Sequence, residues 1–355
     1  ITSFLKKQPG QVFQSIVINE SLQKELGADV GDEILLSLER QSDIHRESLF
    51  GNKKTTDVIR SIRLTVTAVI PDHGIGRFGL RPNQNLPSNA FVSLPVLQRA
   101  LEQRKRVNAI FISGNQNSND NESSELQNLL HSTIKLADLN LQIRKEKNYA
   151  SLESQEFVLK PEVVAAASEF LAEMKAPSLP VLTYLANQIK LNDRLLPYST
   201  VAALNTVTSS AFGQLKLTDG SPAPSLTENE VLLNRWAAED LQAKAGDVVT
   251  MRYFQVGLQE ALLVDSTQLT IKGIIAMEGL GADPTLTPEF PGIHDADNIH
   301  DWDPPFPVDL NLVRPKDEAY WDDYRATPKA FVSPETGQKL WHSRFGDYTS
   351  LRFAA

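Results

Sequence analysis

The 355-residue sequence contains no cysteine, and this excludes disulfide bonds, thiolate metal sites and cysteine nucleophiles. It also lacks any apolar run of about 18 residues, the length that a membrane-spanning helix requires. Basic residues are in deficit, with 35 Lys and Arg against 44 Asp and Glu and a net charge of −9. This balance argues against nucleic acid as a partner, because binding a phosphate backbone needs clustered positive charge. The remaining composition is that of a globular protein, and the length favours two or three folded units.

Recognisable catalytic motifs are also missing. The sequence has no G-x-S-x-G nucleophile elbow and no Walker phosphate loop. Gly74, Gly76 and Gly79 match the dinucleotide-binding spacing after a predicted strand, but Pro82 and Pro87 stand where the phosphate-binding helix should follow. We therefore predict no catalytic residue and no cofactor, and we interpret these glycines as a tightly turned loop.

The main positive feature is an internal repeat. Residues 16–36 align without gaps with residues 231–251. The identical pairs are Asn19/Asn234, Leu26/Leu241, Ala28/Ala243, Gly31/Gly246 and Asp32/Asp247. Two further blocks follow in the same order, residues 64–76 against 269–281 and the sequence Ala-Phe-Val-Ser from Ala90 and again from Ala330. Three matches in one order predict two copies of a single unit.

The repeated residues suit a short α+β unit. Asn19 follows a short apolar strand and can cap a helix by accepting a hydrogen bond from a backbone N–H. Gly31 and Asp32 indicate a tight turn into an alternating strand. The same roles fall in the second copy to Asn234, Gly246 and Asp247. We predict an α+β fold with two similar strand-helix-strand-strand units in tandem.

These blocks divide the chain into three segments. Residues 1–114 hold the first unit, residues 228–355 hold the second, and residues 115–227 form a mixed α/β segment that joins them. The elements predicted for the middle segment are helices over Glu125–Leu136 and Pro161–Lys175 and strands over Leu139–Arg144 and Glu156–Leu159.

An acidic insertion occupies residues 281–325 of the second unit. Its candidate metal ligands are His294, Asp295, Asp297, His300, Asp301 and Asp303. Nitrogen and oxygen ligands of this kind can bind a divalent cation, but the spacing matches neither the calcium-loop nor the helical two-histidine zinc pattern. We therefore predict no metal and interpret the insertion as a solvated acidic loop. Most of its aromatic residues, Trp302, Phe306, Tyr320 and Trp321, are predicted to pack beneath this loop, with a partner-docking surface around Trp302 and Phe306 as the alternative.

The repeat unit resembles the large extracytoplasmic domain of MacB-like, FtsX-like ABC transporter permeases. The residues that carry this resemblance are Ile16–Leu36, Leu64–Gly76, Asn89–Leu94 and Val107–Ile110. It covers residues 12–114 best, with residues 228–281 and 327–353 as the second copy. Its motifs concern strands, a capped helix and glycine turns, so they bear on structure and carry no catalytic residue.

The resemblance implies a non-catalytic domain on the periplasmic or extracellular side of the bacterial cell membrane, between two membrane helices of a permease. It implies a cytoplasmic ATPase subunit as partner through those helices, with a second permease copy and a periplasmic adaptor or lipoprotein as further candidates. Because the sequence starts at Ile1 without Met, we expect a processed chain or a piece of a longer one. The alternatives are a secreted metal-dependent hydrolase using the 294–303 loop and a cell-surface adhesion module.

Overall fold

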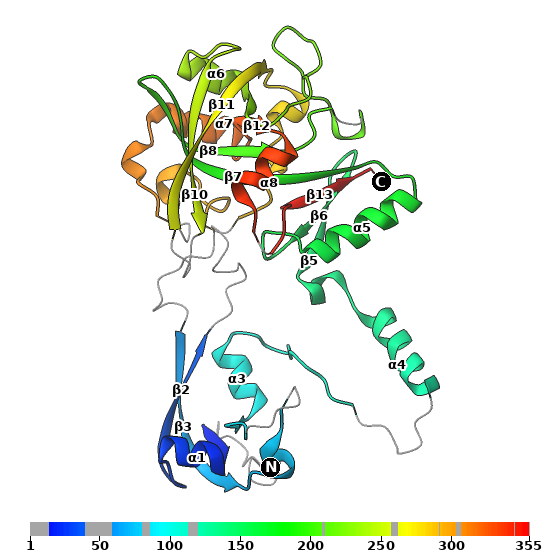
Figure 1. The fold of residues 1–355 in the computed structure, drawn as a ribbon, viewed down its shortest axis with the longest axis vertical. Coiled ribbons are helices and arrows are strands. Elements are labelled where there is room, and N and C mark those ends of the chain that lie inside the picture. Colours follow the sequence, from blue (N-terminus) through cyan, green and yellow to red (C-terminus); the bar gives the residue numbers. More distant parts are fainter. Residues whose placement is uncertain are drawn as a thin grey trace. The chain divides into compact units, whose positions relative to one another are not determined.

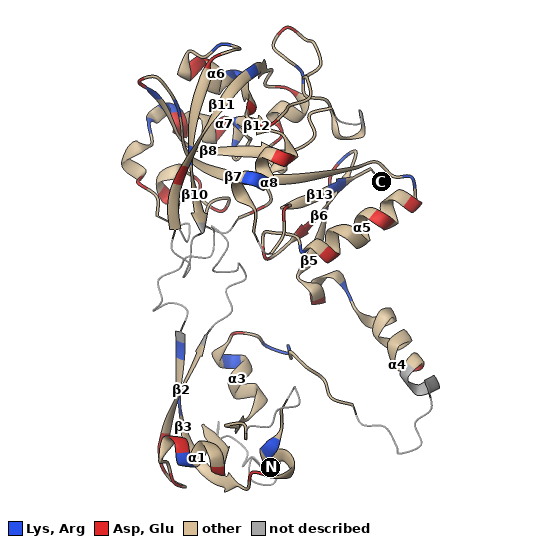
Figure 2. Ribbon diagram, viewed as in Figure 1, with Lys and Arg blue, Asp and Glu red and all other residues tan. Residues whose placement is uncertain are grey.

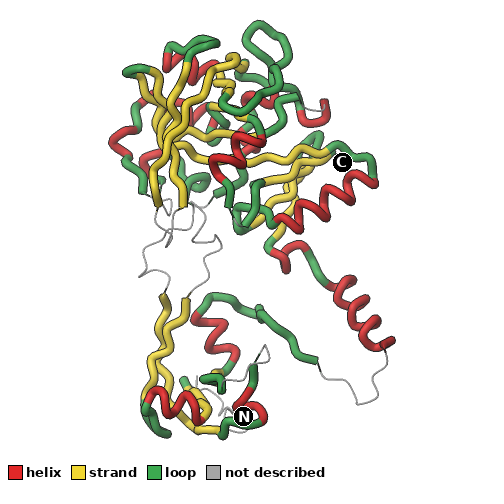
Figure 3. The backbone as a smooth tube through the Cα atoms, in the orientation of Figure 1, coloured by secondary structure: helices red, strands yellow, loops and turns green. Residues whose placement is uncertain are grey.

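A computed structural model describes the protein over residues 14–39, 59–79, 86–112, 120–207, 210–256, 262–290, 292–302, 307–343 and 345–354. Helices and strands alternate along this part of the chain (Figure 3), which confirms the predicted α+β class. The described residues separate into two compact units, the first ending at Ser123 and the second beginning at Ser124. Residues 124–227 of the predicted middle segment belong to the second unit in this division.

The first unit contains an open four-stranded sheet. Its elements are β1 (Ser15–Asn19), α1 (Glu20–Leu26), β2 (Glu33–Glu39), β3 (Ile59–Ile70), β4 (Ala90–Val92) and α3 (Leu94–Ala100). The strand order is β2-β3-β1-β4, in which β1 and β3 are parallel and the other pairs are antiparallel. A small apolar core around Ile16, Ile18, Leu64 and Val66 lies on one face of this sheet.

The second unit is larger, and its boundary at Ser124 falls within its first helix. Its elements are α4 (Asp120–Thr133), β5 (Leu141–Lys145), β6 (Ala150–Ser154), α5 (Pro161–Glu173), β7 (Ser178–Leu191), β8 (Arg194–Ala203), β9 (Glu230–Asn234), α6 (Arg235–Leu241), β10 (Val248–Val256), β11 (Leu262–Ile275), α7 (Pro315–Tyr324), β12 (Ala330–Val332), α8 (Pro334–Trp341) and β13 (Ser350–Phe353). Its sheet has the order β10-β11-β9-β12-β8-β7-β13-β6-β5.

Six of these strands close into a barrel. The carboxyl-terminal half of β7 pairs with β10 at Lys190/Thr250, Ile189/Met251 and Gln188/Arg252, so the order runs β10-β11-β9-β12-β8-β7 and returns to β10. The long strand β7 leaves the barrel at its other end, where its residues 178–181 pair with β13 (Figure 1). Closure removes the open edges of these six strands and makes the barrel a stiff body.

The two units share their strand pairing in detail. Strand β1 pairs with β3 from Ser15/Thr65 to Asn19/Ile70, and β9 pairs with β11 from Glu230/Thr270 to Asn234/Ile275. Both ladders contain a register shift at the aligned position. The orders β2-β3-β1-β4 and β10-β11-β9-β12 also correspond strand by strand.

The predicted local signals are confirmed in both units. The side chain of Asn19 accepts a hydrogen bond from the Leu22 N–H (3.1 Å), and that of Asn234 accepts one from the Ala237 N–H (2.8 Å), so both cap their helices. The turns contain Gly31 and Gly246 at φ values of 105° and 93°, which favour glycine. The turn carboxylates Asp32 and Asp247 each accept a hydrogen bond from the backbone N–H three residues earlier, at 2.8 Å.

The acidic insertion is not the solvated loop that its composition predicted. Its apolar side chains enter the barrel core as part of one cluster, among them Phe290, Ile293, Ile299, Trp302 and Trp321. The predicted packing is confirmed for Trp302, Trp321 and Tyr320, which are all buried, whereas Phe306 lies outside the described residues. The charged residues alternate with these apolar ones and mostly face solvent. A count of charges therefore does not reveal that the insertion also contributes to the core.

Among the helices that the structure describes, none is both long enough and apolar enough to cross a membrane.

Candidate functional site

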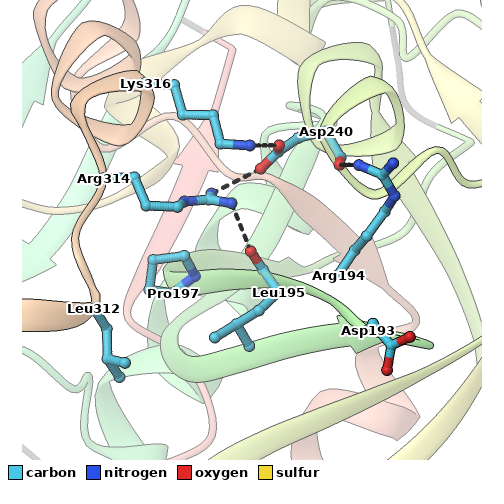
Figure 4. A pocket seen from close by; sticks show the side chains of 8 residues that line it. All are labelled: Asp193, Arg194, Leu195, Pro197, Asp240, Leu312, Arg314 and Lys316. Atoms are coloured by element: carbon cyan, nitrogen blue, oxygen red, sulfur yellow. Dashed lines mark hydrogen bonds and ion pairs between the residues drawn. The ribbon is translucent and has the colours of Figure 1, made fainter.

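A pocket of about 270 Å³ lies at the turn of the β7–β8 hairpin, beside α6 and the start of α7 (Figure 4). Its lining residues are Asp193, Arg194, Leu195, Pro197, Asp240, Leu312, Arg314 and Lys316. Three segments that are distant in the sequence therefore bring both signs of charge to one place.

Arg314 holds the pocket together. Its Nη2 donates to Asp240 Oδ2 (2.7 Å), its Nη1 donates to the Leu195 carbonyl (2.8 Å), and its Nε donates to Asp317 Oδ2 (2.6 Å). Burial alone would lower the pKa of Arg314, but the hydrogen bonds and charges of Asp317 and Asp240 outweigh it and raise the pKa. The guanidinium is therefore fixed in its charged form by planar contacts that a lysine could not reproduce.

Asp240 forms ion pairs through its carboxylate with two cationic side chains of the pocket. Its side chain is only 7% exposed and receives Lys316 as well as Arg314, while its carbonyl accepts a hydrogen bond from Arg194 Nη1 (3.4 Å). The lining includes no serine, threonine, tyrosine or histidine, so neither a hydroxyl nucleophile nor an imidazole base faces the pocket. This arrangement can bind a polar group and fix three segments, and the lining offers no nucleophile–base pair of the kind that hydrolysis uses.

A buried lysine lies close to this pocket. Lys329 Nζ is 3.8 Å from Asp317 Oδ1 and 4.7 Å from the ring centres of both Trp236 and Tyr320. Burial lowers the pKa of Lys329 to about 8, because the attraction of Asp317 offsets only part of the cost of desolvating the ammonium group.

We expect the second unit to become more stable as the pH rises from 8 to 10. The unfolded lysine keeps its proton up to about pH 10, whereas the folded one releases it from about pH 8, so the unfolded state binds more protons in this window. Linkage then adds about 2 kcal/mol to the free energy of unfolding. Urea unfolding at both pH values measures this gain, and Lys329→Met should remove it; an unchanged gain in that variant would assign the effect to other groups.

The structure does not bring together the candidate metal ligands that it describes. His294 Nδ1 accepts a hydrogen bond from the Phe290 N–H, Asp295 accepts one from the Gly292 N–H, and His300 pairs with Glu318. Asp297 is exposed, Asp301 accepts a hydrogen bond from the Asn298 amide, and Asp303 lies outside the described residues. Within the described ranges, no group of three or more His, Asp or Glu side chains could hold a metal ion.

The asparagines of the internal repeat also donate hydrogen bonds to other side chains. The Asn19 amide donates to Asp72 Oδ1 (2.8 Å), and the Asn234 amide donates to the Tyr320 hydroxyl (2.9 Å). The sequence did not identify the residues that line the pocket around Arg314 and Asp240 as candidates. One local signal was available, because Arg314 and Asp317 have the spacing at which the first turn of a helix can be capped by side chains.

Comparisons with known proteins add little. A scan against protein-family models gives no match, and a search of the curated proteins gives no match. Among solved structures, the chain is similar to the periplasmic region of MacB from Actinobacillus actinomycetemcomitans, with a TM-score of 0.28 and 10% sequence identity. The alignment covers 55% of this chain and 64%, less than two thirds, of that one. A similarity this weak carries no argument about function.

Proposed function

We propose that this chain is an extracytoplasmic domain of a bacterial ABC transporter permease of the MacB-like, FtsX-like type. The observation that carries the proposal is the paired occurrence of one strand-helix-strand-strand module, with matching strand order and register, built from the residues on which the resemblance rests. The domain would perform no chemistry of its own. It would bind a substrate or partner protein outside the membrane and transmit motion.

The proposed partners follow from this role. A cytoplasmic ATPase subunit would act through membrane helices outside this sequence, and a second permease copy and a periplasmic adaptor or lipoprotein are further candidates. A domain that transmits displacement must resist deformation. The support in the second unit is the closed barrel, which the Arg314 ion pairs tie to α6 and α7.

The parent gene and intact cells test the proposal. Apolar segments of about 20 residues should flank both ends of this sequence in the parent. Because the chain lacks cysteine, Lys244→Cys in the exposed turn before β10 provides a labelling site in the full-length protein. A membrane-impermeant maleimide should label it in intact cells, and the protein should co-purify from membranes with an ATP-hydrolysing subunit.

The unsubstituted parent protein controls for cysteines elsewhere. Labelling only after cell lysis, or a parent gene with no apolar segment on either side, would contradict the proposal.

A further inference from the structure

Both units contain four strands in the corresponding order, but among the residues that the structure describes the edge strands are paired with a further hairpin only in the second unit. In the second unit, β8 pairs in parallel with β12 from Val201/Ala330 to Ala203/Val332, and β7 pairs with β10 in the antiparallel sense. The β7–β8 hairpin thus occupies both edges of the module and closes it. In the first unit, the aligned edges belong to β4 and β2.

Both of these edges are open in the part of the first unit that the structure describes. There, β4 pairs with β1 alone and β2 pairs with β3 alone. An open edge presents unpaired backbone N–H and C=O groups, and such an edge readily accepts another strand.

Side-chain exposure shows the same difference. Val249, Met251 and Val332 are buried inside the barrel, whereas Ile34, Leu36 and Val92, which align with them, are only half-buried. These three side chains belong to the apolar face that carries the small core of the first unit. The inner face of the first unit is therefore incompletely covered.

The outer face repeats this result. Leu280 is 2% exposed, because it packs with Phe212 and Leu215 from the chain that continues beyond β8. Ile75, at the aligned position of the first unit, is 56% exposed. The β7–β8 hairpin and its continuation contribute to the burial of both faces in the second unit, and apolar side chains of the acidic insertion complete it.

We propose that the open edges of the first unit bind a β-hairpin of another protein, with one strand parallel to β4 and the other antiparallel to β2. This inference does not depend on the proposed transporter function. The occupant is a hairpin because that is what the same module binds in the second unit, where strand addition supplies main-chain hydrogen bonds. The β7–β8 hairpin of a second copy is already paired within its own barrel.

The chemistry of the occupant follows from the surface that it covers. Its strands would turn apolar side chains towards Ile34, Leu36 and Val92, as Ala186, Leu196 and Val201 line the core of the second unit. Acidic and basic residues are intermixed on the elements of the first unit (Figure 2). Recognition would therefore rest on backbone pairing and apolar contact more than on charge.

The test uses the full chain and a synthetic peptide of residues 178–203, the hairpin that this module binds in the second unit. Hydrogen–deuterium exchange followed by mass spectrometry reports each strand separately. With the peptide in excess, we expect exchange in β2 and β4 to slow at least tenfold. Unchanged exchange in β2 and β4, or protection confined to the open edge of β5, would overturn the proposal.

A proline variant gives the sharper control. Val332 accepts a hydrogen bond from the Leu204 N–H, so its backbone faces β8. Val92 is aligned with Val332, so its backbone N–H and C=O groups face the open edge. Backbone direction alternates along a strand, so the same groups of Ala90, two residues earlier, face this edge as well. Ala90→Pro then removes one outward N–H while the pairing of β4 with β1 is kept, and peptide affinity should fall at least tenfold.

The matched control is Ile143→Pro, which places the same residue on the outward side of β5. The Asn140 carbonyl faces β6, because it accepts a hydrogen bond from the Gln155 N–H. Ile143 lies three residues further on, and backbone direction alternates along a strand, so its backbone N–H and C=O groups face away from β6. This variant should bind the peptide like the unchanged protein, and an equal loss would overturn the proposal. If exchange in β1 shows that Ala90→Pro does not fold, Ala90→Lys replaces it. Protection of β2 and β4 that rises with protein concentration alone would assign the edges to a second copy and also overturn the proposal.

Discussion

An Arg352→Met variant should lose about 3 to 5 kcal/mol of the free energy of unfolding of the second unit, the cost of breaking a buried ion pair. Arg352 in β13 is completely buried, and its Nη1 donates to Asp283 Oδ2 (2.8 Å) while its Nη2 donates to Thr285 Oγ1 (3.1 Å). The guanidinium also lies 4.6 Å from the centre of the Tyr149 ring. Methionine fills similar space but leaves the partly buried Asp283 carboxylate without its cation.

The direction of the Asp283 pKa supports this expectation. Burial alone would raise the pKa of Asp283, yet the charge of Arg352 and the hydrogen bonds of Thr285 outweigh burial, and the pKa is lowered. The pair therefore stabilises the folded state at neutral pH, and this contribution is lost as the pH falls through the folded pKa of Asp283.

Tryptophan fluorescence in urea measures the loss. All four tryptophans, Trp236, Trp302, Trp321 and Trp341, lie in the second unit, so their signal reports its unfolding. The control is Arg352→Met combined with Asp283→Asn, which removes both charges and should recover part of the lost stability. If the single variant lost less than about 1 kcal/mol, the pair would be no more important than an exposed one.

The features that could be predicted from the sequence are the local ones. Asn19 and Asn234 cap helices, and Gly31 and Gly246 adopt positive φ, because each signal involves residues within a few positions of one another. The helix predicted over Pro161–Lys175 is confirmed as α5 for the same reason. Periodicity and capping act within a single element, so one sequence is enough to recognise them.

The strands of the middle segment were harder to predict. A strand was expected over Glu156–Leu159, but those residues form turns and a single bridge, while Ala150–Ser154 form β6. Short apolar runs do not reveal which partners they will pair with, and pairing decides which run becomes a strand. For the same reason, nothing in the local sequence showed that β7 would pair with β10 and close the barrel.

The pocket around Arg314 and Asp240 could not be predicted either, because it is formed by residues that are distant in the sequence. Asp240 and Arg314 are 74 residues apart and lie at the ends of two helices, where charged residues usually face solvent. Only the packing of α6, α7 and the β7–β8 hairpin brings them together. Helix α4 shows the converse, because the sequence predicted a helix with one apolar face, and Leu129 on that face is 62% exposed.

The second large effect is expected for Gly281→Ala, in the short turn after β11. A Cβ atom there would lie 2.4 Å from the Ala276 carbonyl oxygen and 2.6 Å from Ile275 Cγ2. Gly76, at the aligned position of the first unit, has the same restriction, since its Cβ would lie 2.0 Å from the Pro71 carbonyl. Glycine is therefore required at this position because the backbone approaches closely in both units, and not because of its φ angle.

We expect Gly281→Ala to destabilise the second unit by about 3 kcal/mol or more, at the upper end of what overpacking costs. The control is Gly273→Ala in the same unit, where a Cβ would meet Leu217 Cδ2 at 2.9 Å. That atom ends a flexible side chain that can turn away, whereas the carbonyl of Ala276 is fixed by the turn, so the control should lose about 1 kcal/mol or less. Tryptophan fluorescence in urea compares the two variants. If Gly281→Ala lost no more stability than Gly273→Ala, the close backbone approach would not explain why both units have glycine at this position.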